Sequence, residues 1–590
     1  MIRLAVDFGA KFADFVVWDD SAVRILKRPV TGDMAVDLTA GLDALNLDAA
    51  VLSELRVVTT APINALLARM PVPVALLTTR GFADTLRLGR QNRVALYDPV
   101  ARSPAPAFLV DPQDIHEVGG RLDAKGTVLT PLERADMDAA IAALRNRDIR
   151  SVAICLLFSH VNPAQELQLA EAIRSDLPDI SISLSHQVDA GPREYERTVS
   201  VLTDAWLAAR MDAPLHDVRA ALRARGFVGE LAFGDGRGVL VPDQAAGAHR
   251  AILLSGAPAA AAHAAADLSG EGGVIAADIG SLSADMSTAH AGQTRMADSC
   301  LLAGVPLREA CTDIESVALG GARRVEEGPR GLRFAATGPL AAGPAEAPSL
   351  DDALAGLGRL PDAARWSAPF TPAAAVAFAA ARMAYALTRY ATRRNIDPGR
   401  VALAVMGGTG ALLAADIAAA MGLDRVLLPR APGASGAIGL MQAARRSEAS
   451  ARIDRPLPEL TPEILGALLD QLEAECPGSG ALVYSVTLAA QRQMHPMPLR
   501  LAARPESGDQ IAQAFGAGFH DEFGIVPPGP GYLFSLSVHR DAVTLTPPMP
   551  DLPGIATTGL IATEAGAIWC PEGWTLRRKD MAYLLERSPS

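Results

Sequence analysis

The chain has 590 residues and a net charge of −12 at neutral pH with no long basic run, so it lacks the positive footprint of a nucleic-acid-binding protein. Its length predicts two to four domains, and an apolar content of 49% is enough for several cores. The five cysteines form no CxxC pair, no apolar run reaches the roughly 20 residues that span a bilayer, and the N-terminus lacks a signal-peptide plan, so we expect a cytoplasmic protein without a membrane partner.

The first predicted element is a β-hairpin in the sequence VDFGAKFADFVVWD (6–19). An apolar strand runs into Asp7, the turn Gly9-Ala10-Lys11 follows, and a second apolar strand carries Asp14. Glycine lets backbone N–H groups approach phosphate oxygens without a clash from Cβ, so the pattern is typical of a nucleotide-phosphate hairpin. The alternative is an ordinary hairpin in which the aspartates are turn or cap residues.

Short β-rich runs then alternate with helical runs, which indicates an α/β sheet. Strands are predicted at 55–60, 72–79, 151–160 and 180–185, and helices at 61–70, 163–174, 194–211 and 256–270. The last of these helices is rich in alanine, and we expect it to serve packing.

The opening pattern occurs a second time within GGVIAADIGSLSADMSTAHAG (272–292). Asp7-x-Gly9-x-x-x-x-Asp14 is repeated as Asp278-x-Gly280-x-x-x-x-Asp285, again after an apolar strand. One such match is weak evidence, but two matches at corresponding positions of two α/β segments predict a duplicated domain.

The second half of the chain changes character twice. Residues 325–370 are rich in Gly, Pro and Ala and are predicted to be loop-like, whereas 373–395 is predicted to be a long helix. A strand, a glycine turn and a helix are predicted over 401–422, and a strand, a Pro/Gly loop and a helix over 425–446. From about residue 451 there is more proline and the β-like runs are shorter. The predicted domains are 1–190, 191–450 and 451–590. We expect the loop-like stretch and the last domain to contribute an exposed apolar patch for partner or self-association.

Two facing hairpins, each with an aspartate, would clamp a metal-bound triphosphate across a cleft. Asp7 and Asp278 are the candidate catalytic and metal residues, and they would hold Mg²⁺ (or Mn²⁺) through water, because Mg²⁺ keeps part of its hydration shell. The candidate nucleotide-binding residues are Gly9, Lys11, Asp14, Gly280, Ser283, Asp285, Gly320, Gly321, Gly407, Gly408 and Gly410. The alternatives are that these glycines only form turns and that Lys11 is solvated.

Several longer segments resemble one family. They are TTAPINALL (59–67), LLTTRGFADTLRLGRQNRVALYD (76–98), REYERT (193–198), PSLDDALAGLGRL (348–360) and LLPRAPGASGAIGL (427–440). On these segments the chain resembles the hydantoinase A/5-oxoprolinase family of the actin-like ATPase superfamily, almost end to end. The resemblance implies an α/β fold: two RNase H-like (actin/Hsp70-type) lobes around a nucleotide cleft, plus a smaller C-terminal α+β domain.

The resemblance also implies a function. Family members couple ATP hydrolysis to the opening of cyclic amides, with ATP phosphorylating a carbonyl oxygen before ring opening, and usually act with a separate B-type subunit. The leading expectation is therefore the A-type subunit of a cyclic-amide hydrolase. The alternative enzyme is the ATP-using subunit of a ketone carboxylase, so the substrate would be a small cyclic amide or a ketone.

The phosphate loops depart from the family pattern. The family's D-x-GGT-x-TD and D-x-GGTSTD loops each lose one glycine and two threonines here, although both aspartates of each loop are retained. Each lost hydroxyl donor costs roughly 1.5–3 kcal/mol of phosphate binding. Lys11 and Arg323 are placed where a cation could offset part of that loss. The third expectation is an inactive paralogue that acts as a structural partner.

Overall fold

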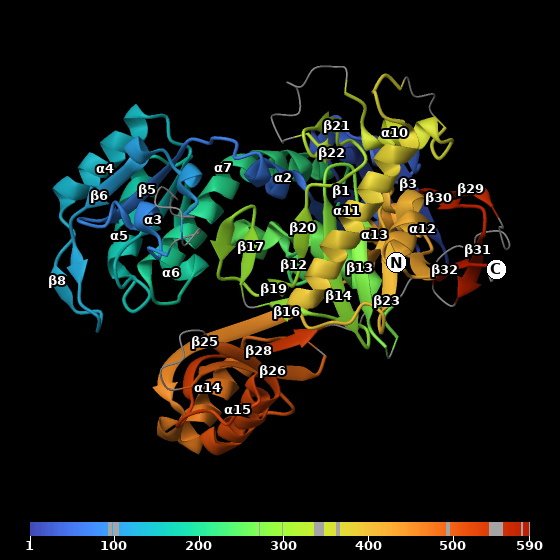
Figure 1. The fold of residues 1–590 in the computed structure, drawn as a ribbon. Helices are drawn as coiled ribbons and strands as arrows, with labels where there is room; N and C mark the ends of the chain where they lie inside the picture. The colour runs from blue at the N-terminus through green and yellow to red at the C-terminus, as the bar shows by residue number, and fades with distance from the viewer. Residues whose placement is uncertain are drawn as a thin grey trace. The chain divides into compact units, whose positions relative to one another are not determined.

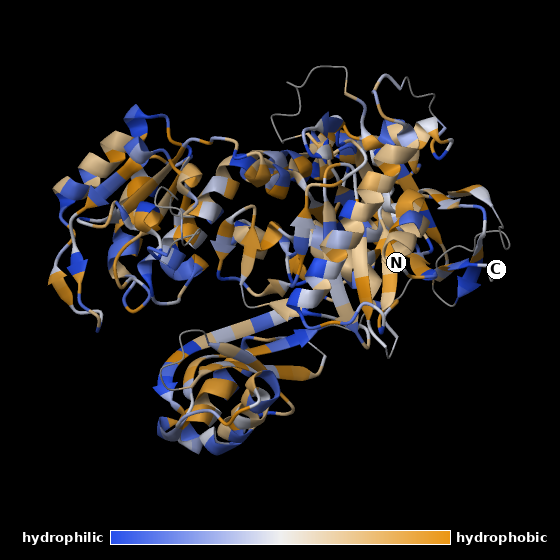
Figure 2. Ribbon diagram, in the orientation of Figure 1, coloured by the Kyte–Doolittle hydropathy of each residue, from blue (hydrophilic) through white to orange (hydrophobic). Residues whose placement is uncertain are grey.

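The computed structural model describes residues 1–92, 97, 105–270, 272–297, 299–335, 347–361, 366–478, 480–490, 496–541, 558–579 and 582–588 (Figure 1). The chain divides into two compact units, and each is described by itself. Unit 1 is Met1–Ala443 with Thr546–Ser590, and unit 2 is Ala444–Leu545. Hydrophobic residues concentrate in the strands, and hydrophilic residues on outer helices and loops (Figure 2).

The first lobe of unit 1 is built on a six-stranded sheet with the order β12-β11-β4-β1-β2-β3. Its strands are β1 (Ile2–Phe8), β2 (Phe12–Trp18), β3 (Val23–Pro29), β4 (Leu52–Thr59), β11 (Glu230–Gly234) and β12 (Leu240–Pro242). The first three strands form an antiparallel meander, and β4 and β11 run parallel to β1. Helices α1 (Met34–Ala44) and α7 (Glu194–Ala224) bury leucines and valines against this sheet.

The second lobe repeats this plan. Its sheet has the order β15-β14-β13-β23-β24-β32-β31, and β20 pairs with β14. The strands are β13 (Val274–Ile279), β14 (Ala284–His290), β15 (Gln293–Thr294), β20 (Glu315–Val317), β23 (Ala402–Met406), β24 (Arg425–Pro429), β31 (Trp574–Lys579) and β32 (Ala582–Arg587). Helices α11 (Pro372–Arg393) and α12 (Gly410–Ala420) pack on it. The predicted duplication and the two RNase H-like lobes are confirmed.

A four-stranded parallel sheet is inserted into the first lobe between β4 and α7. Its order is β10-β9-β5-β6, and its elements are β5 (Val74–Thr79), β6 (Ile115–Val118), β9 (Ser151–Cys155), β10 (Ser181–Leu184), α4 (Arg134–Asn146) and α5 (Ala164–Asp176). The N-terminal half of α7 covers one face, with Trp206 fully buried. The helix extends beyond the predicted 194–211 because its C-terminal half packs Leu215, Val218 and Leu222 into the core of the first lobe's sheet.

Two helices rich in small residues bring distant parts of unit 1 together. The alanine-rich α9 (Gly256–Ala266) is almost entirely buried, and α13 (Ser435–Gln442) packs on it and on β1. A Cβ on Gly439 would overlap the carbonyl oxygen of Ala260, so the two helices can approach this closely only because the residue is glycine. Helix α13 is thereby held against the first lobe's sheet.

The stretch 325–370 is more ordered than predicted where it is described. It contains β21 (Val325–Gly328), β22 (Gly331–Phe334) and α10 (Leu350–Gly356), while 336–346 and 362–365 lie outside the described residues. Helix α10 forms because Ser349 and Asp352 make a complete capping box. The Gly/Pro-rich composition concealed this local signal.

The shorter elements of unit 1 are α2 (Ala61–Leu67), α3 (Thr85–Leu88), α6 (Ser185–Val188), α8 (Asp243–Ala248), β7 (Arg121–Leu122), β8 (Val128–Thr130), β16 (Met296–Ala297), β17 (Cys300–Leu302), β18 (Val305–Leu307), β19 (Cys311–Thr312), β29 (Gly559–Thr563) and β30 (Gly566–Cys570). Its 3₁₀ turns are Ala49–Val51, Ala107–Leu109, Pro112–Asp114, Arg250–Leu253 and Pro432–Ala434.

Unit 2 is an α+β fold with an antiparallel sheet of order β25-β28-β26-β27. Its elements are β25 (Arg446–Pro456), α14 (Pro462–Ala474), β26 (Leu482–Ala489), β27 (Met497–Leu501), α15 (Gly508–Phe523), β28 (Tyr532–Asp541) and a 3₁₀ turn at Leu457–Glu459. The two helices enclose a core with Leu469, Phe515 and Leu536.

The last strands do not belong to unit 2. The sequence predicts one domain over 451–590, whereas β32 pairs antiparallel with β24 over five residues and so extends the second lobe's sheet. The alternating apolar residues of β32 are buried in that lobe. The amino-acid composition of a segment does not indicate that its strands pair with a sheet formed earlier in the chain.

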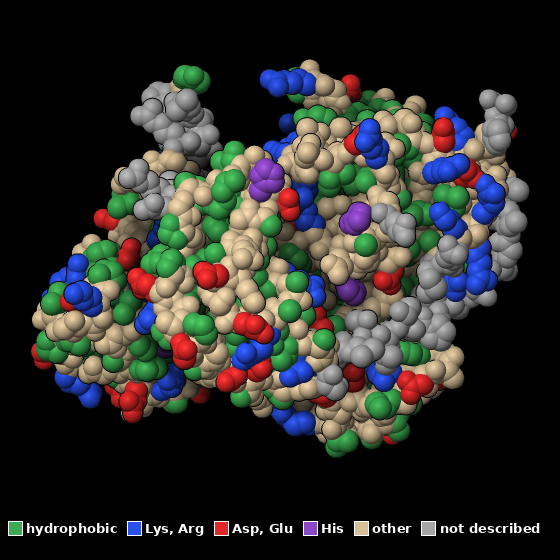
Figure 3. All heavy atoms as spheres, turned by 90° about the horizontal axis from the view of Figure 1, so that it is seen from below, with side chains coloured by type: hydrophobic (Ala, Val, Ile, Leu, Met, Phe, Trp, Pro, Cys, Tyr) green, Lys and Arg blue, Asp and Glu red, His purple; other side chains and the backbone are tan. Residues whose placement is uncertain are grey.

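Within the described residues, no helix is long and apolar enough to cross a membrane. The face drawn in Figure 3 mixes basic and acidic side chains, and among its coloured side chains there is no continuous basic stripe.

Candidate functional site

The two Asp-x-Gly hairpins have the same register. Asp7 is paired with Asp14 across β1 and β2, and Asp278 is paired with Asp285 across β13 and β14. The turns match as well: the N–H of Gly9 donates to the Phe12 carbonyl at 3.0 Å, and the N–H of Gly280 donates to the Ser283 carbonyl at 3.0 Å. The sequence repeat is therefore a repeat of backbone geometry.

The four aspartates lie close enough for their charges to interact. Burial raises the pKa of Asp7 to about 8, and the charges of Asp14 and Asp278 contribute to that rise. Burial, followed by the charge of Asp285, raises the pKa of Asp278 to about 7. Burial also raises the pKa of Asp285 to about 6, against a hydrogen bond from Ser316. Asp7 and Asp278 thus belong to one electrostatic site, although they come from different lobes.

Lys27 on β3 is the cation inside this acidic site. Its ammonium lies 2.6 and 2.9 Å from the two carboxylate oxygens of Asp14 and donates to the carbonyl of Gly433 at 2.9 Å. Burial raises the pKa of Asp14, and the charge of Lys27 opposes that rise. Lys27 is not among the residues predicted from the sequence. It faces Asp14 across the adjacent strands β2 and β3, and that cross-strand pairing is the local signal that indicates it.

Two glycines press against the central carboxylates. A Cβ on Gly436, in the first turn of α13, would overlap Oδ2 of Asp7. Gly407 has a φ of +84°, and a Cβ there would lie 2.5 Å from Oδ1 of Asp278. Gly407 therefore lies against the carboxylate of Asp278 and Gly436 against that of Asp7, and Gly436 is not among the residues predicted from the sequence. A Cβ on Gly408 would meet no atom within 4 Å, whereas a Cβ on Gly410 would lie 3.2 Å from Val405 and 3.4 Å from Ile279.

The Gly320-Gly321 turn is stacked on the second hairpin. The N–H of Gly321 donates to the carbonyl of Gly280 at 3.1 Å, and a Cβ on Gly320 would lie 2.5 Å from the carbonyl oxygen of Ser281. A Cβ on Gly321 would overlap the carboxylate of Asp351. The turn is thus placed beside the second hairpin, and its glycines are required by the close approach.

Lys11 reaches from the first hairpin to the second lobe. Its ammonium lies 3.4 Å from Oδ2 of Asp351 in α10, so the residue predicted to hold phosphate has a carboxylate partner. Arg323 donates through Nε to the carbonyl of Leu282 at 2.9 Å and so braces the second hairpin turn.

The donor set fits a hydrated divalent cation. Oδ1 of Asp7 is buried and has no hydrogen-bond partner among the described residues, and a buried carboxylate oxygen of this kind calls for a cation or a water. Across the described ranges, no three His, Cys, Asp or Glu side chains are grouped to hold a metal directly. Mg²⁺ suits such a site because it binds through one or two carboxylates and keeps several waters.

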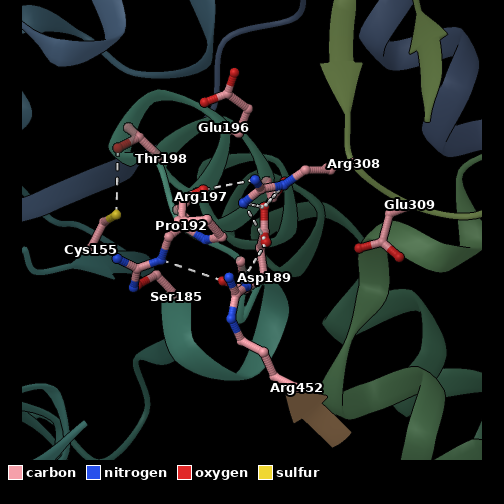
Figure 4. Close-up of polar contacts among 12 residues, drawn as sticks. Cys155, Ser185, Asp189, Pro192, Glu196, Arg197, Thr198, Arg308, Glu309 and Arg452 are labelled. Carbon is pink, nitrogen blue, oxygen red and sulfur yellow. Dashed lines mark hydrogen bonds and ion pairs between the residues drawn. The ribbon is translucent and has the colours of Figure 1, made fainter. Parts of the chain in front are cut away.

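A second polar cluster lies at the start of α7 and is structural (Figure 4). The buried guanidinium of Arg197 donates to the carbonyl of Leu156 at 3.2 Å and to that of Asp189 at 3.4 Å. The Asp189 side chain lies 2.7 Å from Arg308, which also donates to the Pro192 carbonyl at 2.7 Å. These contacts fix the turn before α7, so Arg197 of the REYERT segment has a structural role.

Protein-family comparisons match most of the chain. Residues 3–177 match the model described as the hydantoinase/oxoprolinase N-terminal region, and residues 197–374 and 370–449 match the model described as hydantoinase/oxoprolinase.

Individual relatives give the same picture. The caprolactamase alpha subunit of Pseudomonas jessenii is 27% identical, over 95% of this chain and 89% of its own length. The acetophenone carboxylase gamma subunit of Aromatoleum aromaticum is 32% identical, but over 38% of this chain and 33% of its own length.

Solved structures share the fold. A nucleotide-free acetone carboxylase superposes with a TM-score of 0.82 over 99% of both chains at 17% identity. The ATP-dependent caprolactamase from Pseudomonas jessenii superposes with a TM-score of 0.78 over 100% of both chains at 23% identity.

Proposed function

The chain belongs to the hydantoinase/oxoprolinase family, and we propose that it is the A-type subunit of an ATP-dependent cyclic-amide hydrolase. The observation that carries the proposal is the pair of equal-register hairpins whose aspartates, Asp7 and Asp278, share one electrostatic site. Support comes from the relative named as an ATP-dependent caprolactamase, since caprolactam is a cyclic amide.

Asp7 and Asp278 would hold Mg²⁺ or Mn²⁺ through water, and the turns that begin at Gly9 and Gly280 would face the phosphates of ATP. The bound nucleotide would supply a phosphoryl group to the carbonyl oxygen of the cyclic amide. The chain's own contribution is to position these groups and to balance charge, which is most of what protein residues do in phosphoryl transfer. Lys27 opposes the rise that burial causes in the pKa of Asp14, and Gly436 and Gly407 fix the carboxylates of Asp7 and Asp278.

Cation binding should release protons. The pKa values of Asp7 and Asp278, about 8 and about 7, leave these carboxyls partly protonated at neutral pH, and a divalent cation binds the ionised form. Calorimetry of Mg²⁺ binding at pH 7 in two buffers of different ionisation enthalpy measures this release without any turnover. We expect a release that falls in Asp7→Asn. No release from the wild type at millimolar Mg²⁺ would contradict the assignment of the metal site.

Nucleotide binding is tested by ATP titration of the full chain with and without Mg²⁺. We expect weak binding that requires Mg²⁺ and that weakens in Lys11→Ala. Equal binding by the wild type and Lys11→Ala would show that Lys11 does not replace the missing threonine hydroxyls. No heat at millimolar ATP, even with a partner subunit present, would favour the structural paralogue, for which the Lys11–Asp351 contact is the supporting observation.

The carboxylase is the second candidate enzyme, and the similarity to the acetophenone carboxylase gamma subunit over 38% of the chain supports it. The two activities separate on the co-substrate. A hydrolase consumes ATP when a lactam or hydantoin is added, whereas a carboxylase needs a ketone together with bicarbonate. Relatives named as alpha and gamma subunits support a separate partner polypeptide, which both assays should contain.

A further inference from the structure

Asp351 lies in the first turn of α10 but takes no part in the capping box of that helix. The capping box is complete without it, because Asp352 accepts from the N–H and the hydroxyl of Ser349 and the Ser349 hydroxyl accepts from the N–H of Asp352. The side chain of Asp351 instead reaches Lys11 of the first lobe, 340 residues away in the sequence.

The surroundings of Asp351 are those of the candidate phosphate site. Its carboxylate lies where a Cβ on Gly321 would project, beside the hydroxyl of Thr409. The N–H of Asp351 donates to the carbonyl of Gly321 at 2.7 Å, so the helix start is tied to the glycine turn. Lys11 approaches the same carboxylate from the first lobe. The carboxylate of Asp351 therefore lies between the Gly320-Gly321 turn of the second lobe and Lys11 of the first lobe.

We infer that Asp351 is a tethered anion that competes with phosphate for Lys11, so that a phosphate-bearing ligand has to displace it. The inference rests on the proposed function in one respect, since it takes the space between the lobes to be a phosphate site. It deepens that proposal because it identifies a residue that sets the site's affinity.

The ion pair between Lys11 and Asp351 is weak enough for a competing anion to displace it. The side chains of Lys11 and Asp351 are 46% and 33% exposed, and the two groups lie 3.4 Å apart, so solvent screens the attraction. The Lys27–Asp14 pair is the contrast, since its side chains are 24% and 13% exposed at 2.6 Å and the ammonium also binds a carbonyl. Lys27 is a permanent part of the site, whereas Lys11 can exchange one anion for another.

The test is titration of the full chain with two probes, tripolyphosphate and Mg·ATP, on the wild type, Asp351→Asn, Lys11→Met and the double variant. Asp351→Asn should bind both probes about five- to tenfold more tightly than the wild type. The gain should shrink in the Lys11→Met background, because no shared cation remains for the two anions to compete for. Asp397→Asn is the matched control: it removes the same charge from the same lobe, in a turn ahead of β23 and so at the opposite end of the sheet from Asp278.

The outcomes separate the inference from the proposed function. A gain for tripolyphosphate without any ATP binding supports the tethered anion and removes the nucleotide function. ATP binding by the wild type with no gain in Asp351→Asn keeps the function and overturns the inference. An equal gain in Asp397→Asn, or an undiminished gain in the Lys11→Met background, would reduce the effect to general charge repulsion and also overturn it. No binding of either probe by any variant would remove both.

Discussion

Gly436 in the first turn of α13 stands against the carboxylate of Asp7, so closely that a Cβ would overlap Oδ2. We predict that Gly436→Ala lowers the free energy of unfolding by about 1–3 kcal/mol, the usual cost of overpacking, and weakens Mg²⁺-nucleotide binding because Asp7 is displaced. Thermal unfolding and calorimetric titration of the full chain measure the two effects.

Gly247→Ala is the matched control for that substitution. Gly247 lies in α8 of the same unit, and a Cβ added there would have no atom within 4 Å, so the change in unfolding free energy should stay within about 0.5 kcal/mol. If Gly436→Ala unfolds and binds like this control, the contact between α13 and Asp7 is not tight.

Ionisation of the central carboxyls should make the protein less stable as the pH rises. Asp7, Asp278 and Asp285 have folded-state pKa values of about 8, 7 and 6, above the ordinary value of 3.8. Between pH 3.8 and these values the folded state holds protons that the unfolded chain has lost, so raising the pH favours unfolding until it passes about 8. The melting temperature should therefore fall from about pH 5.5 to about pH 8.5.

Asp7→Asn isolates the contribution of Asp7, because it removes one of these protons and leaves the other titrating groups in place. The melting temperature of the wild type minus that of this variant should therefore fall as the pH rises through about 8. Mg²⁺ should raise the wild-type melting temperature more at about pH 8.5 than at about pH 5.5, since it binds the ionised carboxylates. A pH slope that Asp7→Asn leaves unchanged would mean that Asp7 titrates normally.

Lys27 should be essential for the stability of the first hairpin. Lys27→Met leaves Asp14 largely buried without its cation, and breaking a buried pair costs about 3–5 kcal/mol of unfolding free energy. Asp14→Asn in the same chain should restore part of the loss, because it removes the uncompensated charge. A double-mutant cycle by chemical denaturation gives the coupling energy, and strictly additive losses would show that the pair does not interact.

The fold could be predicted wherever the signal is local. The repeated Asp-x-Gly hairpins indicated both lobes, because a hairpin register is set by a few adjacent residues, and Asp7 with Asp14 and Asp278 with Asp285 are opposed as the spacing implied. The long helix predicted at 373–395 corresponds to α11. The arrangement of the two lobes around a cleft was predicted from the family resemblance, because the spacing of the motifs does not indicate how two lobes face each other.

The rest of the site depends on residues that are distant in sequence. Asp351 and Gly436 approach Lys11 and Asp7 only through the packing of α10 and α13. Lys27 is the exception, because it faces Asp14 across two adjacent strands. No local pattern marks Asp351, since one acid in the first turn of a helix is an ordinary feature. The roles assigned to the candidate nucleotide residues remain predictions until a ligand is bound.

Association should depend on the exposed apolar residues at the end of α15. Phe523, Ile525 and Val526 of unit 2 are 50%, 58% and 79% exposed, within four consecutive positions. Serine at all three should reduce binding to a B-type partner, or self-association where that occurs, while leaving the melting temperature nearly unchanged because little buried area is lost. Light scattering coupled to size exclusion, with the chain alone and with its partner, measures this. Val228→Ser is the control, since Val228 is 86% exposed in unit 1. A wild-type chain that stays a strict monomer and ignores the partner would contradict the prediction, and so would a triple variant that associates as well as Val228→Ser.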